Sequence, residues 1–95
     1  MQIYEINLWA DVAPASAAGT YTMAAADDSG NNLLSAATFD LETLLSDTQT
    51  TVTLTATTAD LQLTAAEWAV FTFTSNNADL TLTDLNLTVL FAAQA

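Results

Sequence analysis

The sequence contains no lysine, arginine, histidine or cysteine, and its eleven acidic residues give it a formal net charge of −11. Nucleic acids and anionic membranes are bound through Lys and Arg, so neither is expected as a partner. Without Cys there is no disulfide and no thiolate nucleophile. Without His or Cys, zinc sites and His-dependent catalytic triads lack their usual groups. The composition therefore predicts a protein that is not an enzyme and carries no cofactor.

Large apolar side chains are also scarce. Hydrophobic residues make up 52% of the chain, but many of them are Ala, and only two Gly and one Pro interrupt the sequence. Ninety-five residues of this composition can bury one thin core and no deep catalytic cleft. We therefore expect one domain over residues 1–95. No apolar run has the length of a membrane helix, and residues 1–5 do not have the pattern of a signal peptide.

Two-residue alternation of apolar and polar side chains, rich in Thr, runs through most of the chain and predicts short β-strands. The segment 68–74 has apolar residues on both faces, so we predict a strand that is central or covered by a neighbour. Pro14 is expected to end the first strand, and a turn or bulge at 83–84 to separate the last two. The fold class predicted is all-β, an antiparallel β-sandwich, jelly-roll-like, with seven to eight short strands. The expected strands are 4–12, 20–25, 37–42, 51–57, 68–74, 80–82 and 85–91, and residues 61–63 are expected to form a further short strand or a staple.

Two groups of acidic residues were weighed as sites. Asp27, Asp28 and Asn31 fall in a loop of oxygen-bearing side chains, which is the ligand chemistry of Ca²⁺. The same composition is typical of a hairpin turn, and the spacing is not that of an EF-hand, so the turn is favoured and no metal is expected. Asp40 and Glu42 lie two apart on one strand face, and a solvated face is favoured over an acid–base pair.

The interface candidates lie mainly in the first strand. Residues 2–12 are predicted to offer a strand edge to a partner, because main-chain pairing and an apolar patch would suffice for binding. Trp9 and Trp68 fall opposite the most regular apolar residues of their strands, where an aromatic ring can anchor an interface or stack on a sugar. Packing in the core or at the sandwich edge is the favoured alternative for both. The candidates are Ile3, Tyr4, Ile6, Trp9 and Trp68.

Several segments carry a resemblance to a known group of proteins: Gly19–Thr22, Asp28–Asn32, Leu34–Leu41, Val52–Thr55, Ala59–Leu61 and Phe73–Leu80. Together they resemble the small Thr-rich β-sandwich modules of tailed-phage virion proteins, which include capsid decoration (cement) proteins and head or tail fibre domains. The resemblance implies a structural protein on the outer capsid surface of the virion, bound to the major capsid protein and assembled as a homotrimer. The alternatives are a fibre or adaptor module and a carbohydrate-binding module that uses Trp9 or Trp68.

The charge balance also predicts an electrostatic response. Eleven carboxylates without a side-chain cation repel one another, which should raise their folded pKa values as a set. Turn Asp residues that accept backbone N–H bonds would act in the opposite direction.

Overall fold

A computed structural model of the chain describes residues 1–15, 20–76 and 81–93. The regular structure in these ranges is β-strand apart from two short 3-10 helices. The elements are β1 (Gln2–Ala15), β2 (Tyr21–Asp27), β3 (Phe39–Asp40), η1 (Leu41–Thr43), β4 (Thr50–Val52), η2 (Thr58–Leu61), β5 (Ala69–Ser75) and β6 (Thr81–Ala92). The all-β prediction is confirmed, with six strands in the described ranges rather than seven or eight.

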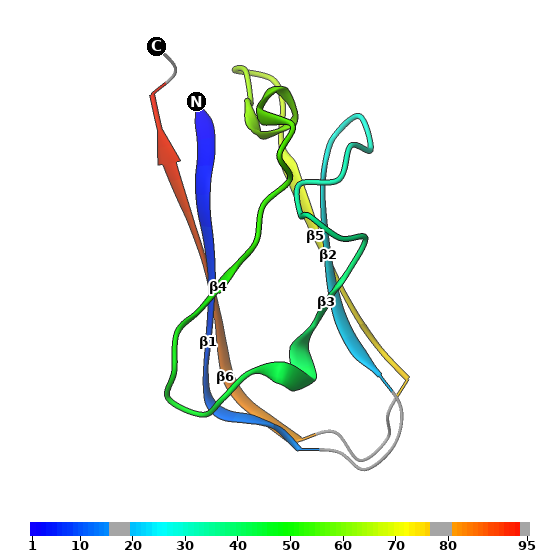
Figure 1. The fold of residues 1–95 in the computed structure, drawn as a ribbon, viewed down its shortest axis with the longest axis vertical. Coiled ribbons are helices and arrows are strands. Elements are labelled where there is room, and N and C mark those ends of the chain that lie inside the picture. Colours follow the sequence, from blue (N-terminus) through cyan, green and yellow to red (C-terminus); the bar gives the residue numbers. More distant parts are fainter. Residues whose placement is uncertain (16–19, 77–80, 94–95) are drawn as a thin grey trace.

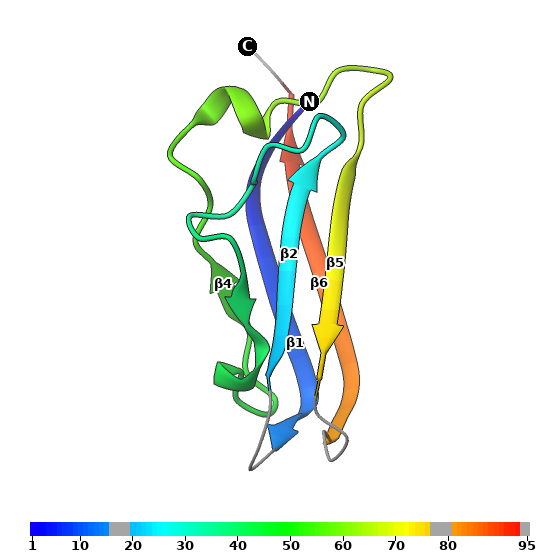
Figure 2. The same ribbon diagram turned by 90° about the vertical axis from the view of Figure 1, so that its right-hand side faces the viewer.

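The strands form two antiparallel three-stranded sheets, with the orders β4-β1-β6 and β3-β2-β5. The two sheets lie opposite each other along the long axis of the molecule (Figure 1). The edge strands on one side, β3 and β4, are only two and three residues long. On the other side β5 and β6 run for seven and twelve residues, so the two sides of the molecule differ in construction (Figure 2).

Two predicted strand breaks are wrong, because the chain absorbs them within a strand. Pro14 does not end β1: the register with β6 shifts between Val12 and Ala15, and such an irregularity accommodates the missing proline N–H. Asp84 does not separate two strands. It adopts a φ of +54° inside the continuous strand β6, which Asp tolerates better than most residues. Leu80, the first residue of the predicted strand 80–82, lies outside the described residues.

A second register shift explains why the first strand buries Ile3 instead of Tyr4. Ile3 pairs with Phe91 and Glu5 with Leu90, so one extra residue lies on β1 at this point. The extra residue reverses the alternation. Ile3 and Ile6 therefore both face the core and are fully buried, while Tyr4 is 54% exposed.

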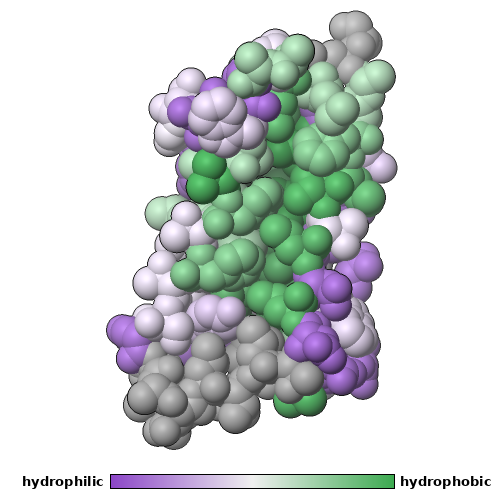
Figure 3. Space-filling view, turned by 180° about the vertical axis from the view of Figure 1, so that it is seen from behind, coloured by the Kyte–Doolittle hydropathy of each residue, from purple (hydrophilic) through white to green (hydrophobic). Residues whose placement is uncertain are grey.

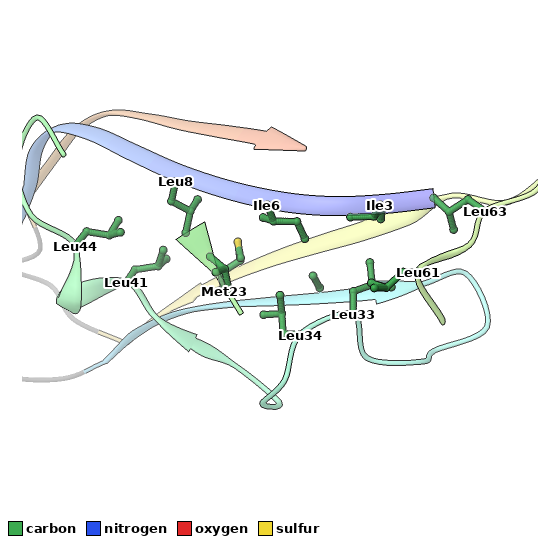
Figure 4. Packing of buried hydrophobic residues seen from close by; sticks show 12 residues of the cluster. Ile3, Ile6, Leu8, Met23, Leu33, Leu34, Leu41, Leu44, Leu61 and Leu63 are labelled. Atoms are coloured by element: carbon green, nitrogen blue, oxygen red, sulfur yellow. The ribbon is translucent and has the colours of Figure 1, made fainter. Parts of the chain in front are cut away.

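The core lies between the two sheets. Ile3, Ile6 and Leu8 of β1 face Met23 of β2 (Figure 4), and Ala25 of β2 belongs to the same buried cluster. The long segment between β2 and β5 adds six buried leucines to this cluster: Leu33, Leu34, Leu41, Leu44, Leu61 and Leu63. Each buried side chain of this size contributes about 1.5–3 kcal/mol relative to exposure. The leucine-bearing segment runs on the β3–β4 side (Figure 2), so that side of the core is closed.

Candidate protein-interaction surface

On the side opposite this segment, core-facing side chains of two edge strands stay partly exposed. Phe71 and Phe73 of β5 pair with Ala25 and Met23 and so lie on the inner face of their sheet. The β6 residues that pair with Ile3, Ile6, Leu8 and Ala10 likewise lie on the inner face of their sheet. We call this side the open flank, formed by Ala69, Phe71 and Phe73 of β5 and by Leu85, Leu87, Val89 and Phe91 of β6.

The side chains of the open flank are more exposed than the residues with which they pair on the central strands. Met23 is fully buried, whereas its partner Phe73 is 40% exposed. Ile3 is fully buried, whereas its partner Phe91 is 44% exposed. Space-filling shows the consequence, a band of hydrophobic residues along this face (Figure 3). Exposed apolar bands of this kind mark sites of protein association.

A groove of about 820 Å³ lies at one end of the open flank. Trp68 and Phe71 line it on the β5 side, Val89 and Phe91 on the β6 side, and Leu63 also borders it. Trp68 is 59% exposed. The polar lining consists of Thr64, Glu67 and Met1, whose α-ammonium group donates to the Leu63 carbonyl oxygen at 3.1 Å. The rest of the lining is apolar, so the groove suits apolar side chains.

The backbone edges beside the groove are unprotected. Among the strands in the described ranges, β5 is paired only with β2, and β6 only with β1. β5 carries no charged residue and no proline, the two devices that most often protect an edge strand from pairing with another chain. β6 carries a single charge, Asp84. The flank therefore combines exposed apolar side chains with backbone groups available for pairing.

The polar residue of the groove is held in place by a local turn. The Thr64 backbone N–H donates to Glu67 Oε1 at 3.0 Å, and the Thr64 hydroxyl donates to the same oxygen. These bonds hold the pKa of Glu67 below its ordinary value, chiefly through the Thr64 side chain, while the nearby Asp27 charge opposes the lowering. Glu67 is thus an oriented carboxylate at the mouth of an apolar groove.

The loop weighed as a Ca²⁺ site uses its oxygens to build a turn. Asp27 Oδ1 accepts the backbone N–H of Ser29 at 3.0 Å and of Asn31 at 2.8 Å, and Oδ2 accepts Asn31 Nδ2 at 3.0 Å. Both oxygens are thereby engaged, while Asp28 and Asn31 are exposed. Within the described residues, three or more carboxylates do not come together as a metal site would need. Asp40 has a similar role, since its Oδ1 accepts the Glu42 N–H at 2.9 Å and caps η1.

The predicted rise of the carboxyl pKa values is wrong for the two residues where a shift is clear. The pKa of Asp27 is lowered, first by the Asn31 side chain and then by the Asn31 backbone, and the pKa of Glu67 is lowered as described above. For Asp27 the hydrogen bonds to the charged form outweigh desolvation, and for Glu67 they outweigh both desolvation and the repulsion from Asp27.

The interface candidates divide between core and surface. The N-terminal strand is not an edge, because β1 lies between β4 and β6. Ile3 and Ile6 are core residues, and their assignment to an interface is wrong. Tyr4 is exposed and Trp9 half-buried, and both alternate with the inward residues of β1. Trp68 is the one candidate at the open flank.

The residues that sequence analysis missed are those of the flank itself. Segment 68–74 was interpreted as central or covered because it is apolar on both faces, yet β5 is an edge strand. The signal that could have found the flank is its lack of charge: from Trp68 onward the only acidic residues are Asp79 and Asp84.

No helix within the described ranges is long and apolar enough to cross a membrane. Comparison with known protein families, with curated proteins and with solved structures finds no match to this chain.

Proposed function

We propose that this chain is a structural protein of a virion, a capsid decoration protein that binds the outer shell through its open flank. The observation that carries the proposal is the exposure of core-facing side chains, Phe73 and Phe91 above all, beside two unprotected strand edges. Covering this flank would bury apolar surface and complete backbone pairing at the same time. Catalysis has no part in the proposal, since the sequence lacks His, Cys, Lys and Arg.

A protein partner fits the groove better than a sugar. Trp68 offers an exposed ring on which a sugar could stack. The polar groups beside it are few, however, and the Glu67 carboxylate already accepts hydrogen bonds from Thr64. Sugar recognition needs several free donors and acceptors around the ring, whereas apolar side chains of a protein need none.

The finer fold proposal is a jelly-roll-like β-sandwich. It is supported by two long antiparallel ribbons, β1 with β6 and β2 with β5. The first ends at the pair Ala15–Thr81 and the second begins at Tyr21–Ser75, as expected for one ribbon folded across the two sheets.

In this proposal the partner is the major capsid protein, and any homotrimer uses other surfaces. Tyr4 and Trp9, which alternate with the inward residues of β1, are available for contacts between copies. Such contacts would leave the open flank free for the shell.

Copy number in purified particles tests this function. A decoration protein should be present in many copies, on the scale of the major capsid protein, and particles without it should assemble but rupture at a lower temperature. A few copies per particle, with rupture unchanged and adsorption lost, would identify a fibre or adaptor module instead. Absence from particles would contradict the virion assignment. Glycan-dependent quenching of Trp fluorescence would favour the carbohydrate-binding alternative.

A further inference from the structure

We propose that the open flank is occupied by an extended, basic-ended segment of another protein, which pairs with β5 as an added strand and places Lys or Arg beside Glu67. This inference rests on the proposed function in one respect only, the use of the flank as the contact surface. It specifies the chemistry of the partner: alternate apolar side chains flanked by positive charge.

The backbone of β5 favours an added strand. In an antiparallel edge strand, alternate residues direct their N–H and C=O groups away from the single neighbour. The residues of β5 lack charge and proline, so nothing in the strand opposes pairing on that side. β6 is the less suitable edge, because Asp84 places both a charge and a positive φ within it.

The space beside β5 fits the side chains of such a strand. Alternate side chains of an added strand would point into the gap between the sheets, where Phe71 and Phe73 stay partly exposed. The groove of about 820 Å³ at the end of the gap, bordered by Trp68 and Phe91, has room for more than one apolar side chain.

Charge complementarity selects another protein over a second copy. The chain has a net charge of −11 with no Lys, Arg or His, so a second copy could bring no basic side chain to this flank and would add only further carboxylates. The groove mouth is itself acidic. Asp27 pairs with Ala69 at the start of β5, and its charge acts on Glu67, while the neighbouring Asp28 is exposed. A basic residue at the end of an incoming strand would meet these carboxylates.

A designed peptide tests the proposal directly. The probe is a short peptide in which Thr alternates with Val and Leu and both ends carry Lys pairs. One control carries Glu in place of Lys, and a second keeps the composition but breaks the alternation.

Calorimetry gives the affinity for the unchanged chain, and in a Trp9→Phe variant the emission of Trp68 reports burial of the flank. We expect the Lys peptide to bind at least about tenfold more tightly than either control, because it alone matches both shape and charge. We also expect the Trp68 emission to shift to the blue.

Matched variants on one strand locate the binding face. Phe73→Thr removes an inward side chain that is 40% exposed, and Val70→Thr removes a neighbour that is 44% exposed on the other face of β5. We expect Phe73→Thr to weaken binding about tenfold or more and Val70→Thr to change it by less than about twofold. Glu67→Gln keeps an oxygen for Thr64 and should reduce the preference for Lys over Glu ends.

Three outcomes overturn the proposal. The first is failure of the Lys peptide to bind below about 1 mM, and the second is equal affinity for the Lys and Glu peptides. The third is a dimer of the free chain that is lost in Phe73→Thr but not in Val70→Thr, which would make a second copy the occupant. The virion assignment is judged separately, by copy number in particles, so either idea can fail alone.

Discussion

At the scale of single residues, two carboxylates of this protein, Asp27 and Glu67, are held by uncharged hydrogen-bond donors instead of cations. Asp27 accepts hydrogen bonds from Ser29 and Asn31, and Glu67 accepts them from Thr64. Each organises a turn at the same end of the β2–β5 ribbon, where Asp27 pairs with Ala69. Because a charged oxygen accepts these bonds more strongly than a protonated one, the turns depend on ionisation.

The two lowered pKa values set the sign of the acid response. The contribution of Asp27 and Glu67 to stability is complete above their ordinary pKa values, 3.8 and 4.5. This contribution to stability is lost as the pH falls through the lowered pKa values that the two residues have in the folded protein. We expect the melting temperature of the isolated protein to fall on acidification in this range. Asp27→Ala should have a lower melting temperature at neutral pH, and its melting temperature should fall less on acidification. Asp28→Ala is the control. An Asp27→Ala profile that coincides with the unchanged protein would contradict this account.

Gly30 provides a test of backbone conformation in the same loop. Its φ is +89°, and a Cβ added there would meet nothing within 4 Å, so the cost of a side chain is conformational. We expect Gly30→Ala to lower the free energy of unfolding by about 1–2 kcal/mol, and Gly30→Asn to cost less because Asn tolerates positive φ. Urea unfolding measures both. Equal costs for Ala and Asn would show that something other than φ is responsible.

At the scale of elements, the first strand shows how a local irregularity decides which side chains are buried. The extra residue between Ile3 and Glu5 places Ile3 and Ile6 in the core and turns Tyr4 outward. A second irregularity carries β1 past Pro14.

We expect Ile6→Ala to lower the free energy of unfolding by about 2–5 kcal/mol, because Ile6 is fully buried in the core. Tyr4→Ala should cost less than about 1 kcal/mol, since Tyr4 is exposed. Chemical denaturation compares the two. A larger loss of unfolding free energy for Tyr4→Ala than for Ile6→Ala would mean that Tyr4 is the buried residue, and it would contradict the register shift.

Sequence patterns predicted what is local in this fold and missed what is not. Alternation around Met23 and around Leu87 located β2 and β6 and the side chains that face inward, because that signal lies within each strand. Whether a strand is central or at an edge depends on pairing across the chain. The pattern therefore placed residues 2–12 at an edge, and residues 68–74 in the centre or partly covered by a neighbour. In the fold β1 is the central strand of its sheet and β5 is an edge strand. Trp68 was found as an exposed aromatic residue, but its neighbours on the open flank come from two strands whose proximity no local pattern encodes.

At the scale of the whole molecule, one side of the core is closed by leucines of the β2–β5 segment and the other remains open. The two long strands of the open side carry a single charged residue, Asp84. The remaining acidic residues are spread over the chain without a Lys, Arg or His to balance them.

Uncompensated charge predicts a salt response of the isolated protein. At neutral pH, raising NaCl from low concentration to about 0.5 M should raise the melting temperature, because salt screens repulsion among carboxylates. Near pH 4 the effect should shrink as the carboxylates take up protons. A melting temperature that falls with salt at neutral pH would show that local hydrogen bonds dominate the electrostatics throughout.

The central claim is that the fold leaves the β5–β6 flank open for a partner, and amide hydrogen exchange tests it most directly. In the free chain we expect the β5 amides that point away from β2 to exchange rapidly. The amides of residues 6–8, where β1 pairs with both β4 and β6, should be protected. Saturation with the Lys-ended peptide should slow exchange in β5 and leave β4 unchanged. Slow exchange throughout β5 before any peptide is added, or protection that appears at β4 instead, would contradict the account.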